Sequence, residues 1–353
     1  MLYRVREVAG KRDLKRFIRF PESLYKGCSQ YVPPLHKGQE HELMHAASLR
    51  YCQRKMWLAE DASGKVVGRI CAMINPRYNE KYGTKRARFG WFDLINDMDV
   101  AKLLFDAAES WAKGEGMDEI HGPLYYNTLG RQGMLVEGFD RISTMALIYN
   151  HPYYPEHLKK LGFVKETGWI ENRITIPEEL PEKFNRVIEL MNQKYELKVK
   201  KLTTSQIKKE GYGRKFFKLI NETYNVLYGF SLLSDKQIDK YVNLYLSFID
   251  ARMLTFVEDK DGNLIAAAAS MPSIAQALQK CRGELFPFGW WHLVKAMFWK
   301  KSDTVELLLI GVVPEWQKKG IVALLFDDLL RTYKKLGFKY AETNAMLERN
   351  VKI

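Results

Sequence analysis

The chain has 353 residues, of which 46% are hydrophobic and 27% charged, and its formal net charge at pH 7 is +13. This composition excludes disordered and fibrous proteins, and the length predicts two domains of ordinary size. The surplus of Lys and Arg favours an anionic partner, such as a phosphate compound, without selecting one.

Three features of the chain bear on where it works. Four cysteines without a CxxC pair indicate reduced core residues and not a disulfide framework. The first seventeen residues contain no apolar stretch of the kind found in signal peptides. The longest weakly polar stretch, 264–278, is shorter than a membrane span requires. We therefore predict a cytoplasmic protein with no membrane span.

Each half of the chain contains the same hairpin pattern. Residues 56–70 and 253–266 both read as an apolar run, a polar turn with glycine, and a second apolar run. The turn glycines, Gly64 and Gly262, lie 198 positions apart. Two β-hairpins at corresponding places are the first sign of an internal repeat.

A second pair of matching segments follows the hairpins. The sequence Leu-Leu-Phe-Asp occurs at 103–106 and again at 324–327, an offset of 221. It lies within predicted amphipathic helices at 100–113 and 321–335, each followed by a predicted strand, at 117–121 and 338–343. The ordered matches predict two copies of one α/β unit, with a net insertion of 23 residues in the second copy.

The insertion is expected within 271–303, a segment rich in Trp and Phe. Three interpretations stay open for it. It forms a helical flap that packs on the core, or an apolar pocket or lid for an acyl acceptor. Alternatively its aromatic residues, with Lys295, Lys300 and Lys301 beside them, contact a membrane surface.

Residues 305–321 read as a buried strand that ends at Pro314, followed by a basic loop and a helix start. Unpaired backbone N–H groups at a helix start carry partial positive charge and bind phosphates. Gly320 permits close backbone approach, and Lys318 and Lys319 add charge. The segment therefore predicts a pyrophosphate site, although a plain strand-to-helix connection with solvated lysines would have the same pattern.

Residues 317–322 resemble the Q/R-x-x-G-x-G/A loop of the GNAT superfamily of acyl-CoA-dependent N-acyltransferases. An aromatic helix ending in Gly-Phe, at 153–163, is similar to another feature of that family. The resemblance implies an α/β fold of two tandem GNAT-like domains, 1–176 and 182–353, each with a mixed central sheet flanked by helices. It also implies acetyl-CoA or another acyl-CoA as co-substrate and a small-molecule or peptide amine as acceptor.

The same resemblance places the site in the second copy. The N–H groups of Val312 or Val313 would contact the thioester carbonyl, and Glu306 and Glu342 are candidates for the general base. Either carboxylate is equally well explained as a solvated group at a strand end. The residues implied in acyl-CoA binding are Val312, Val313, Gln317, Lys318, Lys319, Gly320, Ile321, Val322, Ala323, Asn344 and Asn350.

The sequence departs from the family pattern at three places. Val322 stands where the family has Gly or Ala. The first copy has three Asp in 93–100 and no basic residue, so we expect it to be degenerate and unable to hold CoA. The chain ends three residues after Asn350, so the second copy lacks a last helix and strand, and is either truncated or completed in another way.

We therefore predict an acyl-CoA-dependent N-acyltransferase that transfers an acetyl group. A non-catalytic acyl-CoA-binding or interaction protein is the alternative. Residues 41–45 match the HExxH pattern of zinc peptidases, a distant third hypothesis, and we predict no metal site. No RRM, KH or zinc-finger pattern is present, so no nucleic-acid partner is expected. The sequence does not predict an oligomeric state.

Overall fold

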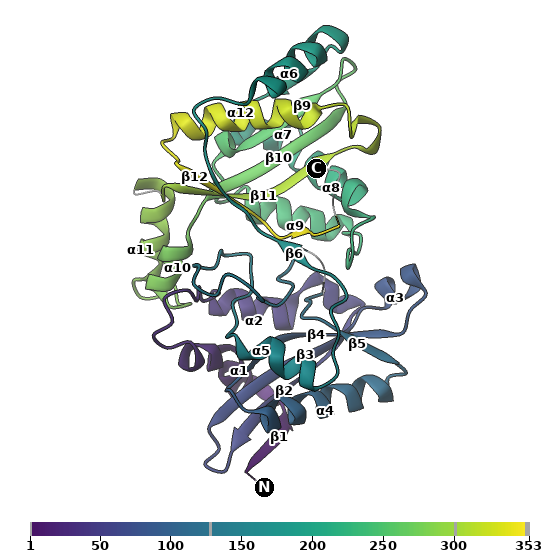
Figure 1. The fold of residues 1–353 in the computed structure, drawn as a ribbon, viewed down its shortest axis with the longest axis vertical. Coiled ribbons are helices and arrows are strands. Elements are labelled where there is room, and N and C mark those ends of the chain that lie inside the picture. Colours follow the sequence, from purple (N-terminus) through teal and green to yellow (C-terminus); the bar gives the residue numbers. More distant parts are fainter. Residues whose placement is uncertain (1, 127–128, 300–301, 350–353) are drawn as a thin grey trace. The chain divides into compact units, whose positions relative to one another are not determined.

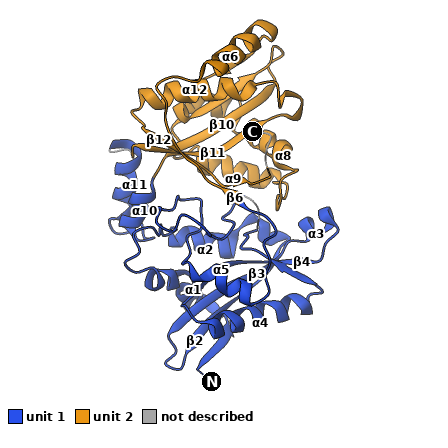
Figure 2. Cartoon of the chain, in the orientation of Figure 1, with its two compact units in different colours: residues 1–168, 274–299 blue, residues 169–273, 300–353 orange. Residues whose placement is uncertain are grey.

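The computed structural model describes residues 2–126, 129–299 and 302–349. They form two compact units, shown in Figure 2: unit 1 contains 1–168 and 274–299, and unit 2 contains 169–273 and 300–353. Residues 169–175 thus lie in unit 2, and most of the aromatic insertion lies in unit 1. The boundary between 176 and 182 remains a prediction about the repeated sequence. None of the helices among the described residues has the length and apolar character needed to cross a bilayer.

Unit 1 has a five-stranded mixed sheet in the order β1-β2-β3-β4-β5. The first four strands are antiparallel, and β5 joins β4 in parallel after the crossover helix α4. The strands are β1 (Tyr3–Glu7), β2 (Gln53–Asp61), β3 (Val66–Ile74), β4 (Arg86–Leu94) and β5 (Glu119–His121). The helices are α1 (Gly10–Leu24), α2 (His36–His45), α3 (Pro76–Tyr82), α4 (Met98–Gly114), α5 (Tyr153–Lys160), α10 (Ala275–Cys281) and α11 (Gly289–Val294).

Unit 2 repeats this plan in a six-stranded sheet, β7-β12-β11-β10-β9-β8 (Figure 1). Strands β9, β10 and β11 are antiparallel, and β12 joins β11 in parallel after helix α12. The strands are β6 (Trp169–Ile170), β7 (Arg173–Thr175), β8 (Lys198–Lys200), β9 (Leu254–Glu258), β10 (Leu264–Pro272), β11 (Thr304–Val312), β12 (Tyr340–Thr343) and β13 (Met346–Leu347). The helices are α6 (Glu182–Lys194), α7 (Thr204–Lys209), α8 (Tyr212–Tyr224), α9 (Asp235–Tyr245) and α12 (Ile321–Lys335).

The two predicted hairpins are formed by β2–β3 and β9–β10, and their turns use the same hydrogen bonds. Asp61 Oδ1 accepts from the N–H groups of Ser63 and Lys65, at 2.9 and 3.0 Å. Asp259 Oδ1 accepts from the residues two and four positions later, at 3.0 and 2.9 Å. The turn glycines, Gly64 and Gly262, have φ of 80° and 81°. This agreement at an offset of 198 supports the duplication.

Helices cover both faces of the sheet in unit 2. Buried side chains of α12 pack with Ala266 and Ala268 of β10. On the other face, a Cβ at Gly311 of β11 would approach side chains of α8 to 3.2 Å. The main core of unit 1 likewise lies between the sheet and α4, where Val100, Leu104 and Ala108 are fully buried.

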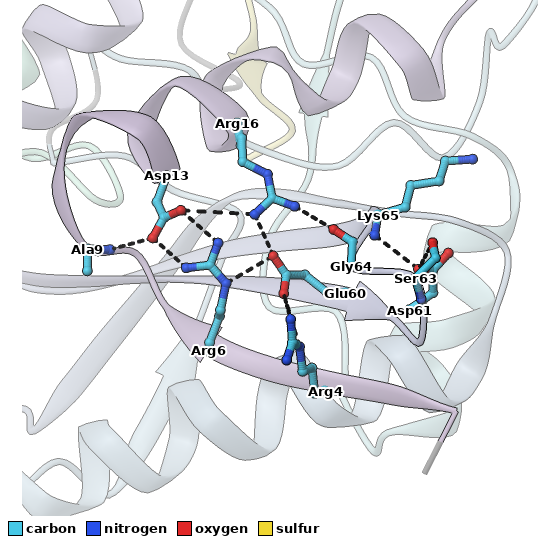
Figure 3. A network of polar contacts seen from close by, with 10 residues as sticks. All are labelled: Arg4, Arg6, Ala9, Asp13, Arg16, Glu60, Asp61, Ser63, Gly64 and Lys65. Atoms are coloured by element: carbon cyan, nitrogen blue, oxygen red, sulfur yellow. Dashed lines mark hydrogen bonds and ion pairs between the residues drawn. The ribbon is translucent and has the colours of Figure 1, made fainter.

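A charged cluster joins β1, α1 and β2 at the edge of unit 1 (Figure 3). The Glu60 carboxylate is 1% exposed and accepts ion pairs from Arg4, Arg6 and Arg16. Arg6 also pairs with Asp13, whose second contact is the Ala9 N–H. Because a buried carboxylate needs opposite charges and hydrogen bonds, the arginines hold Glu60 in place and link the three elements.

Candidate functional site

Strand β11 loses its parallel neighbour halfway along its length. Its pairing with β12 covers only 304–307, whereas its antiparallel pairing with β10 continues to Val312. A β-bulge at the register shift opposite Ala269 and Ser270 lies just beyond the last parallel pair. The second half of β11 therefore presents an edge that β12 does not cover. We refer to 308–312 as the uncovered edge.

Strand geometry determines which backbone groups face this edge. The Val313 N–H donates to the Ile265 carbonyl at 3.0 Å, so Val313 faces β10. Because N–H groups alternate along an antiparallel strand, those of Ile310 and Val312 face the uncovered edge. Of the two predicted carbonyl contacts, Val312 therefore has the suitable orientation and Val313 does not.

Two side chains reach the uncovered edge, one from a distant helix and one from the loop that follows β11. The Tyr224 hydroxyl donates to the Ile310 carbonyl at 3.0 Å and accepts from the Ile310 N–H at 3.4 Å. Desolvation raises the pKa of Tyr224 to about 12, so its proton is retained at neutral pH. Gln317 Nε2 donates to the Val312 carbonyl at 3.0 Å. Gln317 was predicted to touch the cofactor, whereas here its side chain holds the end of β11.

Asn344 lies where β11 and β12 separate. Its N–H donates to the Leu307 carbonyl at 3.2 Å, and its Nδ2 donates to the Leu308 carbonyl at 3.3 Å. Its Oδ1 accepts from the Ala345 N–H. Asn344 thus fixes the point at which the strands diverge. Asn350, the other asparagine predicted to bind the cofactor, lies outside the described residues.

The predicted carboxylates, Glu306 and Glu342, are directly paired across the parallel strands. Glu306 is 3% exposed, and Glu342 forms an ion pair with Arg173 of β7 at 3.5 Å. Side chains of in-register parallel partners lie on the same face of a sheet. The two residues were predicted as separate candidates, and the structure pairs them midway along β11, just before the uncovered edge begins.

A third carboxylate, Glu171, was not found from the sequence. Its neighbour Asn172 exchanges hydrogen bonds with Thr343, both at 2.9 Å, which holds this segment against the end of β12. Desolvation and the charge of Glu342 raise the pKa of Glu171 to about 7. Neighbouring groups partly desolvate the carboxyl, but the residue as a whole keeps contact with solvent, so it can pass a proton to water. A carboxyl with a pKa near neutrality is suited to general base catalysis.

The loop from Val313 to Gly320 leads from the uncovered edge to helix α12. Within the described part of the chain, four backbone N–H groups at its end donate to no protein acceptor; they belong to Lys318, Gly320, Ile321 and Val322. Gly320 has a φ of 88° and caps the helix. Such an array of amides at a helix start favours an anionic ligand.

The side chains of this loop fall into two groups. Ile321 and Ala323 are buried in the core and Val322 is partly buried, so only their backbone is available to a ligand. Lys318 and Lys319 are exposed, and neither has a carboxylate partner among the residues described. The Lys319 ammonium lies 4.5 Å from the Trp316 ring centroid. Two unneutralised cations beside free amides are suited to a diphosphate.

Gly320 is required for packing as well as conformation. A Cβ at this position would lie 2.4 Å from Val187 Cγ1, in helix α6. Any substitution would also have to adopt a left-handed backbone. A variant at Gly320 would therefore disturb the packing of α6 on α12, and Lys318 and Lys319 are better positions for testing the loop.

The corresponding place in unit 1 is closed by the protein itself. The Tyr153 hydroxyl donates to the Leu94 carbonyl at 2.6 Å, and the Leu94 N–H donates to the Tyr154 hydroxyl at 3.0 Å. At the start of α4, the Asp97 carboxylate accepts from the Asp99 N–H and from the Tyr3 hydroxyl. Both the strand edge and the helix start are already occupied, the latter by a negative charge.

The HExxH segment forms part of α2. The His41 and His45 rings lie edge to face on successive turns, with centroids 5.8 Å apart. Across the described ranges, no group of three or more His, Cys, Asp or Glu side chains is arranged to hold a metal ion. The chemically distinctive features are therefore the loop before α12 and the three carboxylates Glu171, Glu306 and Glu342.

Comparison with known proteins finds two relatives over most of the chain, whereas no family model matches. The chain is 30% identical to Protein YghO of Escherichia coli K12, over 98% of this chain and 89% of that protein. It is 23% identical to the bacterial ceramide synthase of Caulobacter vibrioides, over 96% of this chain and 88% of that protein.

Solved structures with a similar fold contain GNAT domains. A tandem GNAT protein from the clavulanic acid biosynthesis pathway matches with a TM-score of 0.52 and 12% identity, over 99% of this chain and 91% of that one. A GCN5-related N-acetyltransferase from Sphaerobacter thermophilus matches with a TM-score of 0.51 and 10% identity, over 99% and 88%. At these identities the likeness concerns the fold alone.

Proposed function

The chain belongs to the family of Protein YghO and has the predicted tandem GNAT fold, and on this basis we propose that it is an acyl-CoA-dependent N-acyltransferase. The observation that carries the proposal is the uncovered edge of β11, which leads directly into the amide-rich start of α12. The uncovered edge suits an acyl thioester, and the start of α12 suits a diphosphate.

The residues present fit acyl-CoA at two places. The free amides of 318–322, together with Lys318 and Lys319, would hold the diphosphate by hydrogen bonds and charge. The Val312 N–H at the uncovered edge would hold the amide-containing arm or the thioester carbonyl. When bound, acyl-CoA supplies an activated acyl group as a thioester.

The reaction requires an acceptor amine to lose a proton and CoA to gain one. We assign proton removal to Glu171, because its raised pKa leaves a substantial share of the carboxylate able to act as base near pH 7. The amine nitrogen attacks the thioester carbonyl, the C–N bond forms, and the C–S bond breaks. Tyr224, which lies at the same strand edge, donates its proton to the departing thiolate and recovers one from water.

Glu342 acts on Glu171 indirectly in this proposal. The negative charge of Glu342 contributes to the raised pKa of Glu171, and Arg173 holds Glu342 in position. Glu306 is buried beside Glu342 on the paired strand. We therefore transfer the general base role from the two predicted carboxylates to Glu171, and regard Glu342 as part of its electrostatic surroundings.

Unit 1 is proposed not to bind acyl-CoA. Its strand edge is filled by the hydroxyls of Tyr153 and Tyr154, and Asp97 occupies the start of α4. A diphosphate placed there would meet a carboxylate instead of lysines. This arrangement supports the interpretation that one copy is active and the other is degenerate.

We propose two alternative reactions, which differ in the acyl group and in the acceptor amine. Acetyl transfer to a small-molecule or peptide amine follows from the similarity of the loop to N-acetyltransferases. Transfer of a long acyl chain to an amino alcohol is favoured by the name of the Caulobacter relative, because a ceramide is an amide of this kind. Both reactions form an amide at the same strand edge.

The direct test is calorimetric titration of the full-length protein with acetyl-CoA and with hexadecanoyl-CoA, followed by an assay of CoA thiol release. Acceptors would include polyamines, peptides and long-chain amino alcohols. Binding and acceptor-dependent thiol release would support the proposal. Absence of binding to both thioesters would overturn it, and binding without release across the whole panel would favour a non-catalytic acyl-CoA-binding protein.

A further inference from the structure

The segment after helix α10 in unit 1 leaves an apolar helix without a partner. Helix α11 continues into a π-helical turn at Lys295–Trp299, and none of the residues in either element is buried. Six aromatic side chains are 43–76% exposed: Phe286, Phe288, Trp290, Trp291, Phe298 and Trp299. We refer to 286–299 as the aromatic arm. Large exposed apolar surfaces of this kind mark interaction sites.

The base of the aromatic arm is firmly attached to unit 1. Gln279 of α10 donates to the Ser29 and Tyr31 carbonyls at 2.7 and 3.0 Å. The His36 N–H donates to the Gly283 carbonyl at 2.8 Å, and Glu284 pairs with Arg19. These contacts fix α10 and the turn after it on unit 1, so the exposed aromatic residues extend from an ordered part of the unit.

Cations without carboxylate partners surround the arm. An open depression of about 590 Å³ beside it is lined by Lys280, Arg282 and His292, and these residues also line a second depression of about 360 Å³. Within the described part of the chain, Lys280, Arg282 and Lys295 form no ion pair with a carboxylate. The Lys37 ammonium lies 5.2 Å from the Phe286 ring centroid. Two carboxylates, Glu22 and Glu284, also line the second depression, where they contact His36 and Arg19. The cations around the arm outnumber these carboxylates, so its surroundings carry a net positive charge.

We propose that the aromatic arm docks unit 1 on the surface of an anionic phospholipid bilayer. Trp and Phe rings favour the boundary between lipid headgroups and acyl chains, where their apolar faces leave water. Lys280, Arg282 and Lys295 would meet lipid phosphates at the same surface. A helix with these two properties lies on a membrane and does not span it.

Charge favours a bilayer over a protein partner as the occupant. Of the two carboxylates beside the arm, Glu284 pairs with Arg19 and Glu22 contacts His36, whereas Lys280, Arg282 and Lys295 keep unneutralised positive charge. The chain as a whole has a net charge of +13, which adds long-range attraction to a negative surface. This proposal does not depend on the acyltransferase function.

The test is sedimentation of the full-length protein with phosphatidylcholine vesicles, with and without 40% phosphatidylglycerol. We expect strong binding to the anionic vesicles, at least tenfold weaker binding to the neutral ones, and weakening by salt. The triple variant Phe288→Ser, Phe298→Ser, Trp299→Ser should reduce the partition coefficient at least tenfold. The matched control Val164→Ser, Leu190→Ser, Val226→Ser changes equally exposed apolar side chains elsewhere and should bind as the wild type does.

Two results would overturn the proposal. One is unchanged vesicle binding by the triple variant, with circular dichroism showing that it is folded. The other is a dimer in vesicle-free buffer that the triple variant converts to a monomer, because the arm would then cover a second copy. Quenching of tryptophan fluorescence by brominated lipid, lost when Trp290→Phe, Trp291→Phe and Trp299→Phe are combined, would independently place the arm in the bilayer.

Discussion

The Tyr224 hydroxyl is hydrogen-bonded to both the carbonyl and the N–H of Ile310, on the edge of β11 that β12 does not cover. A single side chain from α8 thus occupies the backbone groups of one residue at the proposed reaction site. The contact has two consequences. It satisfies an otherwise unpaired strand edge, and it places a protonated hydroxyl beside the position proposed for the thioester.

Replacing Tyr224 with Phe removes the proposed proton donor and keeps the ring. We expect kcat to fall about 100-fold, which is within the usual contribution of general acid catalysis. The KM for acyl-CoA should change little, since the loop before α12 is untouched. Steady-state kinetics would measure both constants, and a kcat equal to that of the wild type would exclude Tyr224 as the donor.

Charge reversal at Lys318 and Lys319 tests the diphosphate site. The double change to Glu places negative charge beside the free amides of 318–322, and we expect affinity for acyl-CoA to fall at least tenfold. Turnover of an acyl-pantetheine, which has no diphosphate, should be much less affected.

The control for this pair is the same charge reversal at Lys208 and Lys209, two exposed lysines on α7 in the same unit. Calorimetry with CoA should show wild-type affinity for the control. If both double variants bound CoA equally weakly, the affinity would depend only on the net charge of the chain. The assignment of the diphosphate site would then be wrong.

The raised pKa of Glu171 predicts how the rate depends on pH. A general base acts in its deprotonated form, so kcat/KM should rise with pH and level off above about 7. Glu171→Gln should lower the rate at least 100-fold and remove this inflection. Glu342→Gln should move the inflection to lower pH, because the neighbouring charge that raises the pKa is gone. A pH profile of Glu171→Gln with the wild-type shape would contradict the assignment.

The charged cluster of unit 1 predicts sensitivity to acid. Hydrogen bonding to Arg6 lowers the pKa of Asp13 to about 2, against about 3.9 in an unfolded chain. The folded-state pKa is the lower one, so the stabilisation is complete above pH 4 and is lost as the pH falls towards 2. Asp13→Asn should cost about 1 kcal/mol at pH 7, allowing for solvent screening around Arg6.

Urea denaturation at pH 7, 4 and 3 would measure this effect, with Asp140→Asn as the control, because Asp140 is highly exposed. The wild type and the control should lose stability in parallel as the pH falls. Asp13→Asn should lose less over the same range, since it has already lost the titrating group. Identical slopes for all three proteins would refute the link to Asp13.

Local patterns in the sequence were sufficient to predict the repeated elements. The hairpin turns depend on Asp61 and Asp259 bonding within five residues, and α12 was predicted from 321 to 335 as observed. The loop before α12 could also be singled out from the sequence, because it consists of consecutive residues; its role in binding acyl-CoA stays a prediction. The tandem α/β fold followed from these elements taken together.

The rest of the site depends on pairings between distant segments. Tyr224 is 86 positions from Ile310, and Glu171 is brought to β12 by the pairing of Asn172 with Thr343. Strand β7 carries no local pattern that assigns it to the second sheet, since its partner β12 lies more than 160 residues later. Local periodicity contains no information about such pairings, and so the proposed general base and proton donor were both missed.

Unit 1 is assembled from two stretches of chain separated by 169–273. During synthesis, α10 leaves the ribosome only after this intervening stretch, which takes roughly 5–20 s at ordinary elongation rates. Until then the Ser29 and Tyr31 carbonyls lack their partner, Gln279. Unit 1 therefore stays incomplete while 169–273 are being synthesised. The order of translation also favours pairing among β1–β5 before the strands of unit 2 are available to pair with them.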